Sequence, residues 1–280
     1  GHGEVSPAAS PATRAAVAPS PDLPGLVVAK ADDIARRIPR HLALYRPAHN
    51  PRVLILDFPD LAAQARTLNR IAVLAEMKGA PRDQVPNDAE IRRLIADAGQ
   101  SYDQFYLGHD YDAATLARFF NLARGGGLSA EERRLLDILL RSRVLRVTEA
   151  GFVAQRPDQA LISLAATGGP TDADIALRRE ILRHELAHGE FFTHLFYRAA
   201  CDGFWHRGLN GYQRGLFLRF LDRAGYDIGN PALVINEVQA YLGFSEDPEV
   251  FGADALGVDD IALAELKQRL DAAMHGRPAF

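Results

Sequence analysis

Two histidines and a glutamate occur together in the run His184-Glu185-Leu186-Ala187-His188. Residues four positions apart lie on the same face of an α-helix, so both imidazoles can bind one metal ion. The glutamate beside them is placed to accept a proton from a water molecule on that metal. The alternative is a surface helix whose His and Glu side chains are merely solvated. The run favours a hydrolytic Zn²⁺ site, with His184 and His188 as ligands and Glu185 as general base.

The surrounding residues predict a long helix that would hold this site rigidly. Gly168-Gly169-Pro170 ends the preceding element, and Thr171 is a good N-cap. Apolar residues then recur at spacings near three and four, which gives one buried face; they are Ile175, Ile181, Leu182, Leu186, Phe192 and Leu195. The pattern fades at Cys201-Asp202-Gly203, so we expect the helix to run from Thr171 to about Ala200.

A catalytic Zn²⁺ usually has three protein ligands and one open position, so a third ligand is required. His194 has the spacing of the metzincin pattern H-E-x-x-H-x-x-G-x-x-H, but Phe191 stands where that pattern has glycine. In an unbroken helix, residue 194 lies about 240° around the axis from His188 and points away from the metal. Glu237 is the second candidate and the one we favour.

Glu237 lies on another predicted helix, which begins at Asn230-Pro231 and ends near Gly243. Two His and one Glu from two helices resemble the gluzincin metallopeptidases, whose third ligand is a glutamate on a downstream helix, often preceded by asparagine, as in Asn236-Glu237 here. The resemblance covers residues 171–243. It implies a zincin-like fold and Zn²⁺-dependent hydrolysis of a peptide or protein substrate. Tyr241 replaces the aspartate of the thermolysin branch, so the branch is not identified.

An enzyme of this type also needs a donor for the developing oxyanion. The candidates are Tyr241, His206, Tyr197, Tyr212 and His109. Tyr241 ranks first because it lies one helical turn from Glu237. Glu190 is expected to point away from the metal, and the single cysteine, Cys201, is expected to be a small buried residue rather than a fourth ligand.

The rest of the pattern predicts a mostly helical α+β, zincin-like fold with a small sheet packed beside the H-E-x-x-H helix and a second helix carrying the Glu ligand. Three strand candidates are Val53–Asp57, a hairpin of 144–148 with 152–155, and the segment near Leu161–Ala165. We expect the last to form the substrate-binding edge, with an ordinary core strand as the alternative. Further helices are predicted at 61–78, 88–98, 112–124, 129–143, 210–224 and 259–274.

Residues 1–25 are rich in Ala, Pro and Ser and are expected to form a flexible tether, followed by one domain over 26–280. Within that domain we expect a helical part over 26–143 and the sheet with the metal-binding helices over 144–280. A tether of this kind is common in exported bacterial proteins, which suggests a periplasmic or secreted location. The net charge of −4 and the lack of a basic cluster argue against nucleic acid, and no segment is apolar enough to span a membrane.

Three functions are compatible with these residues. The first is a zinc metallopeptidase; the second is a zinc hydrolase of a non-peptide amide or ester that uses the same site. The third is a non-catalytic binding module with a structural metal, against which Glu185 argues because a structural site needs no general base. Substrate specificity and oligomeric state are not readable from the sequence.

Overall fold

A computed structural model describes residues 23–280, so most of the expected tether lies outside the described residues. A five-stranded sheet has the order β1–β2–β3–β7–β4, formed by Leu26–Ala29, Ala43–Pro47, Val53–Phe58, Ala160–Ala165 and His109–Asp112 respectively. Strands β5 (Leu145–Thr148) and β6 (Gly151–Ala154) form the hairpin that the sequence predicts. The mostly helical α+β class is confirmed. In residues 23–280 no helix has the length and apolarity needed to cross a membrane.

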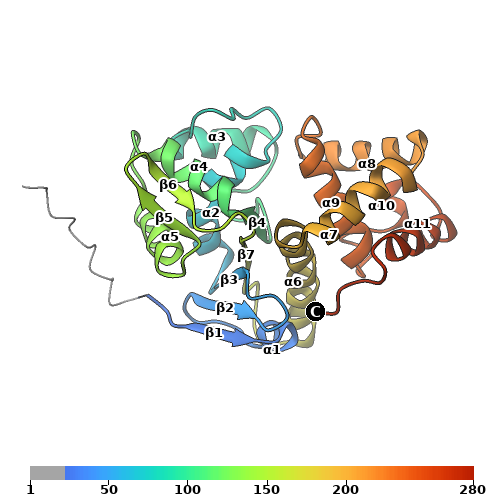
Figure 1. The fold of residues 1–280 in the computed structure, drawn as a ribbon, viewed down its shortest axis with the longest axis horizontal. Coiled ribbons are helices and arrows are strands. Elements are labelled where there is room, and N and C mark those ends of the chain that lie inside the picture. The colour runs from blue at the N-terminus through green and yellow to red at the C-terminus, as the bar shows by residue number, and fades with distance from the viewer. Residues whose placement is uncertain (1–22) are drawn as a thin grey trace, which may run out of the picture.

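The helices lie on both sides of this sheet and beyond it (Figure 1). In chain order they are α1 (Ala31–Arg36), α2 (Leu61–Ala75), α3 (Asp88–Asp97), α4 (Ala113–Ala123), α5 (Ala130–Arg141), α6 (Asp172–Thr193), α7 (Leu195–Gly203), the π-helical turn η1 (Phe204–Gly208), α8 (Gly211–Arg223), α9 (Pro231–Phe244), α10 (Ala253–Leu256) and α11 (Asp260–Ala273). Helix α6 stands between the sheet with α2–α5 and the group α7–α11, as Figure 1 shows.

Strand β7 is an interior strand, which corrects the expectation that Leu161–Ala165 forms the edge. It pairs in parallel with β3 and antiparallel with β4, and all six of its residues are buried. A continuous apolar run of this kind is typical of a strand that is covered on both faces. The strand at this edge of the sheet is β4, where the sequence predicts no strand and only Asp112 was expected to begin a helix.

The sheet is built mainly from segments before residue 144, whereas the sequence placed it in residues 144–280. Strands β1 to β4 all precede that point, and β7 alone follows it. Strand β3, in the middle of this sheet, is covered by helices on both of its faces. Leu54, Leu56 and Phe58 pack against α2, α4 and α5, while Val53 and Ile55 pack against α1 and α6.

Helix α6 begins as predicted, with the Thr171 side chain accepting the backbone N–H of Asp174. It ends at Thr193, so the prediction of one helix to Ala200 is wrong. His194 leaves the helical conformation (φ −118°, ψ 101°), and its side chain caps α7 by accepting the N–H of Tyr197. The amide of Asn50 binds the Thr193 hydroxyl at 2.8 Å and fixes this end of α6 to the loop before β3.

Arg178 fixes the first half of α6 to the sheet. Its guanidinium is fully buried and forms two hydrogen bonds to the Asp57 carboxylate of β3, at 3.0 and 2.7 Å. The remaining donors bind the carbonyl oxygens of Ile34, Ala35 and Arg37 at the end of α1. A buried guanidinium needs this full set of acceptors, because each unpaired donor would carry a desolvation cost.

The substitution Asp57→Asn should lower the free energy of unfolding by about 3 kcal/mol, since it leaves a buried charge without its counter-charge. Burial raises the pKa of Asp57 to about 6 although Arg178 opposes the shift, so unfolding should be measured with urea at a pH above 7, where the pair is ionised. Asp32→Asn is the control, because Asp32 pairs with Arg179 at the surface and should contribute at most ~1 kcal/mol. Equal losses in the two variants would contradict the anchoring role of Arg178.

Candidate metal centre

Helices α6 and α9 bring together the three predicted ligands. His184 and His188 lie one turn apart on α6, and their Nε2 atoms are 3.1 Å from each other. Glu237 projects from α9, and its Oε2 lies 3.6 Å from Nε2 of His184 and 3.4 Å from Nε2 of His188. His188 and Glu237 are buried, whereas His184 is partly exposed. The three side chains therefore present one triangle of donor atoms that is open on the His184 side.

The dimensions of this triangle suit a tetrahedral zinc ion. Bonds of 2.0–2.2 Å to nitrogen and oxygen place the donor atoms of such an ion about 3.3 Å apart. Within residues 23–280, Oε2 of Glu237 is buried without a hydrogen-bond partner, and it faces both imidazoles at ion-pair distance. An unpaired buried carboxylate oxygen at this place is the atom that a shared cation would satisfy. The residues present therefore fit a zinc ion.

Asn236 orients the second histidine. Its Oδ1 lies 2.8 Å from Nδ1 of His188, which leaves Nε2 facing Glu237. The same oxygen accepts a hydrogen bond from Gln239, whose amide also donates to the backbone oxygen of Ala187. Partners of this kind fix the tautomer and the ring orientation of a ligating histidine. The Asn-Glu pair would thus supply one ligand of a metal ion and the support for another.

Glu185 faces strand β4 beside the donor triangle. It is 5% exposed, and a Cβ placed on Gly108 would lie 2.6 Å from its Oε1, so the absence of a side chain at Gly108 makes room for this carboxylate. Glu185 Oε2 has no hydrogen-bond partner within the described residues. The carboxylates of Glu185 and Asp110 lie with His188 in a group whose ligand atoms are all within 4.8 Å of one another.

The charges around His188 decide its protonation. Burial alone would lower its pKa, but Asp110 and Glu237 outweigh burial and raise the pKa to about 10. Burial would raise the pKa of Glu237, but the two histidines lower it to about 2. In the metal-free protein, His188 therefore carries a proton at neutral pH and pairs with ionised Glu237.

Burial and mainly negative neighbours shift the pKa of Glu185 upward. Burial, and then the charges of Glu237 and Glu76, hold its pKa well above the ordinary value, while Asp110 lowers it by hydrogen bonding. A dication between the histidines would add positive charge nearby and favour the carboxylate form. The same cation that fits the triangle would therefore also prepare Glu185 to accept a proton.

A cavity of about 230 Å³ opens beside His184 and Glu185. Its walls are largely apolar and aromatic, and they include Tyr106, Tyr226 and Tyr241. The ring of Tyr241 lies edge-on to His184 with centroids 4.6 Å apart, and its hydroxyl is 3.1 Å from that of Tyr226. Burial raises the pKa of both phenols, so both keep their protons and can donate hydrogen bonds.

The structure places the other sequence candidates away from the triangle. His194, His206 and Tyr212 are exposed. Tyr197 is buried and donates to Gln239, and Cys201 is buried within the core formed by α7–α11. Glu190 accepts a hydrogen bond from Asn50 on the far side of α6, as expected. His109 is buried against Tyr111 and does not line the cavity.

Three residues that sequence reasoning missed complete the site: Asp110, Gly108 and Tyr226. The sequence offers His109 as a donor candidate, whereas its neighbour Asp110 lies in no motif that predicts a role. Asp110 Oδ2 lies 3.5 Å from Nδ1 of His188 because β4 pairs with β7 and passes alongside α6. That pairing joins residues about 50 positions apart, and no local pattern encodes it.

No protein-family model, no curated protein and no solved structure matches this chain. The resemblance to gluzincins therefore depends on the motif residues and on the geometry described above.

Zinc affinity should rise about tenfold or more for each pH unit between about pH 6 and 8. The raised pKa of His188 means that the metal must displace its proton, and raising the pH removes that competition. Competition with a chelator of known zinc affinity measures the slope. Asp110→Asn removes one of the carboxylates that hold this proton, so its slope should level off at a lower pH. A wild-type affinity that does not change with pH would contradict this assignment.

Replacing Asn236 by Leu should weaken zinc binding by about 10- to 100-fold, since His188 loses the acceptor that orients it. Asn236→Asp keeps an oxygen at the same place and should retain most of the affinity. Circular dichroism checks that both variants fold. If the Leu variant bound zinc as tightly as the wild type, Asn236 would have no positioning role.

Proposed function

We propose that this protein is a zinc-dependent metallopeptidase with His184, His188 and Glu237 as ligands and Glu185 as general base. The observation that carries the proposal is the triangle of donor atoms at 3.1, 3.4 and 3.6 Å, with Glu185 beside it, whose Oε2 has no hydrogen-bond partner among the described residues. A structural zinc site is normally closed by four protein ligands, whereas this arrangement has three and opens toward a cavity.

The roles of the side chains follow from their positions. A zinc ion held here would lower the pKa of water and polarise a carbonyl group. Glu185 would accept a proton from the attacking water and deliver it to the leaving amine, since its carboxylate lies beside His188 and against Gly108. The buried position of Glu185 limits competing contact with solvent. These are the parts that hydrolysis of an amide requires.

Tyr241 remains our first candidate for stabilising the oxyanion, and Tyr226 joins it. Both line the cavity beside His184, and their hydroxyls are in contact with each other. One phenol can donate to the other, which leaves a proton available for a carbonyl oxygen in the cavity. We assign the pair to this role, with Tyr241 as the residue nearer to His184.

Strand β4 offers the edge along which a peptide would bind. Within the described residues, β4 has a strand neighbour on one side only, and the segment that leads into it lines the cavity through Leu107 and Gly108. An extended peptide can add to such an edge through backbone hydrogen bonds. This position supports a peptide substrate over a compact non-peptide amide or ester.

Glu185→Gln should keep about one zinc per chain and reduce peptide hydrolysis by about 10²- to 10⁴-fold, because it removes the base but no ligand. Glu237→Ala should lose the metal. His194→Ala is the matched control, since His194 is exposed and caps α7. Metal content is measured by mass spectrometry, and activity with a quenched peptide library.

Either of two results would overturn the proposal. A wild-type protein that stays free of zinc after the metal is added back would exclude the site. Loss of zinc in His194→Ala, with zinc retained in Glu237→Ala, would show that the ligand set is wrong.

A further inference from the structure

One wall of the cavity beside Glu185 is an irregular segment that connects α3 to β4. Tyr106, Leu107 and Gly108 belong to this segment and line the cavity. Gly108 packs directly against the carboxylate of Glu185, so the position of this wall decides how much space that carboxylate has. An irregular segment lacks the regular hydrogen bonds of a helix or sheet, so its buried backbone groups need other partners.

Gln64 of α2 supplies partners for this wall. Its side chain is fully buried, and its amide nitrogen donates to the carbonyl oxygens of Tyr106 and Leu107, each at 3.2 Å. A glutamine amide has two protons, so one side chain can bind two consecutive carbonyl groups in this way. Gln64 therefore joins the cavity wall to the helix behind it.

Ser163 of β7 completes the attachment. This serine is also fully buried, and its hydroxyl donates to Oε1 of Gln64 at 2.8 Å and accepts the backbone N–H of His109 at 3.1 Å. His109 is the residue of β4 that pairs with Ser163 in the sheet. The two side chains thus bind the backbone at positions 106, 107 and 109, which lie on both sides of Gly108.

We propose that Gln64 and Ser163 are positioning residues of the hydrolytic site, which hold Gly108 and the cavity wall in the place that Glu185 requires. This role rests on the proposed function, since it concerns the same site. Among the described residues, neither of the two lines the cavity or belongs to the donor triangle. Both therefore act through the wall that they hold.

The close contact between Gly108 and Glu185 makes the position of the wall important for the reaction. A wall that moved inward would displace the carboxylate, because a Cβ at Gly108 would already lie 2.6 Å from Oε1. A wall that moved outward would release a carboxylate whose Oε2 has no hydrogen-bond partner among the described residues. Misplacing a reacting group by about 1 Å can lower a rate by about 100-fold. We therefore expect the network to affect kcat.

The variants Gln64→Leu and Ser163→Ala of the full chain, loaded with zinc, test this role. Ser163→Ala removes a single oxygen atom and carries the test if Gln64→Leu does not fold. In each variant kcat for a peptide substrate should fall about 10- to 100-fold, with a smaller change in KM and with the zinc retained. Hydrogen–deuterium exchange measured by mass spectrometry should become faster in peptides that cover residues 102–110, where the hydrogen bonds are lost.

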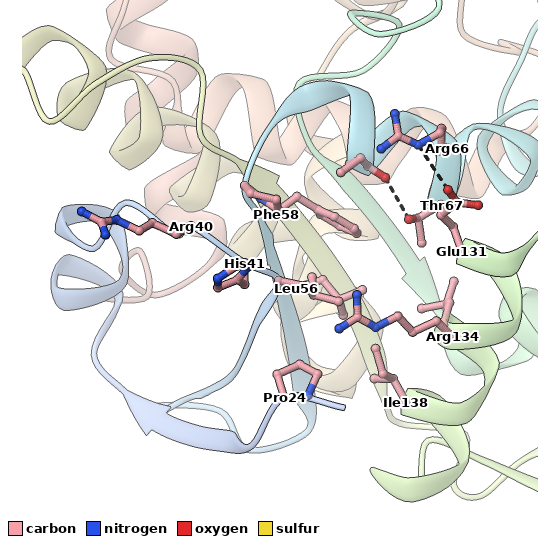
Figure 2. Close-up of a pocket in the computed structure, with 14 residues that line it drawn as sticks. Pro24, Arg40, His41, Leu56, Phe58, Arg66, Thr67, Glu131, Arg134 and Ile138 are labelled. Atoms are coloured by element: carbon pink, nitrogen blue, oxygen red, sulfur yellow. Dashed lines mark hydrogen bonds and ion pairs between the residues drawn. The ribbon is translucent and has the colours of Figure 1, made fainter. Parts of the chain in front are cut away.

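Two control variants lose a buried hydrogen bond elsewhere. Gln159→Leu removes an amide that donates to the carbonyl oxygen of Arg143 at 3.0 Å, so it matches the first variant in chemistry. Thr67→Val acts on α2 itself, because Thr67 lines a separate pocket of about 590 Å³ and its hydroxyl binds the carbonyl oxygen of Ala63 in the same helix (Figure 2). Both controls should keep the wild-type kcat and the wild-type exchange of residues 102–110, even where their melting temperatures fall as far.

Three outcomes would overturn the positioning role while peptide hydrolysis by the wild type stands. They are unchanged exchange of residues 102–110 in both variants, faster exchange with an unchanged kcat, and an equal loss of kcat in Gln159→Leu. A wild type that hydrolyses no peptide would overturn the proposed function, and the positioning role with it. The exchange measurement needs no substrate, so it shows separately whether Gln64 and Ser163 hold the wall.

Discussion

The centre of the molecule buries four carboxylates around one histidine, and this charge must be balanced. Glu76, Asp110, Glu185 and Glu237 are each less than 10% exposed. Burial and the charge of Glu237 raise the pKa of Glu76 to about 8, and the pKa of Asp110 also lies well above its ordinary value. The metal-free site therefore retains protons on groups that are usually ionised. A divalent cation at the His-His-Glu triangle would balance the same charge without them, since such an ion becomes the largest local charge.

This balance of charge requires that α6 hold its histidines in one fixed position. Contacts before and after the two histidines attach the helix to the rest of the protein. Arg178 joins the helix to Asp57 and α1 before the site, and Thr193 joins it to Asn50 after the site. Between these points the sheet approaches closely, because a Cβ on Gly189 would lie 2.9 Å from Val53. The ligands are thus set by packing along the whole helix, which is how a preorganised site is kept rigid.

The residues that sequence reasoning identified are those whose positions depend on local periodicity. His184, Glu185 and His188 follow from helical spacing, and Glu237 follows from a helix with a clear Asn-Pro start. The approach of Asp110 depends instead on long-range strand pairing, and the interior position of β7 depends on β4 taking the edge. The sequence also does not predict that α6 ends at Thr193. Histidine is not a usual N-cap, and no local pattern indicates that the Thr193 hydroxyl binds Asn50.

Strand β3 lies between the helix of the metal centre and the core formed with α2, α4 and α5. Its odd-numbered residues from Val53 to Asp57 face α6 and hold the helix of the metal centre, while Leu56 and Phe58 face the core formed with α2, α4 and α5. Side chains alternate along a strand, so a slip of one residue would exchange these two faces. Pairing with β2 on one side and β7 on the other fixes the register. One constraint therefore places Asp57 against Arg178 on one face of β3 and keeps Leu56 and Phe58 in the core on the other face.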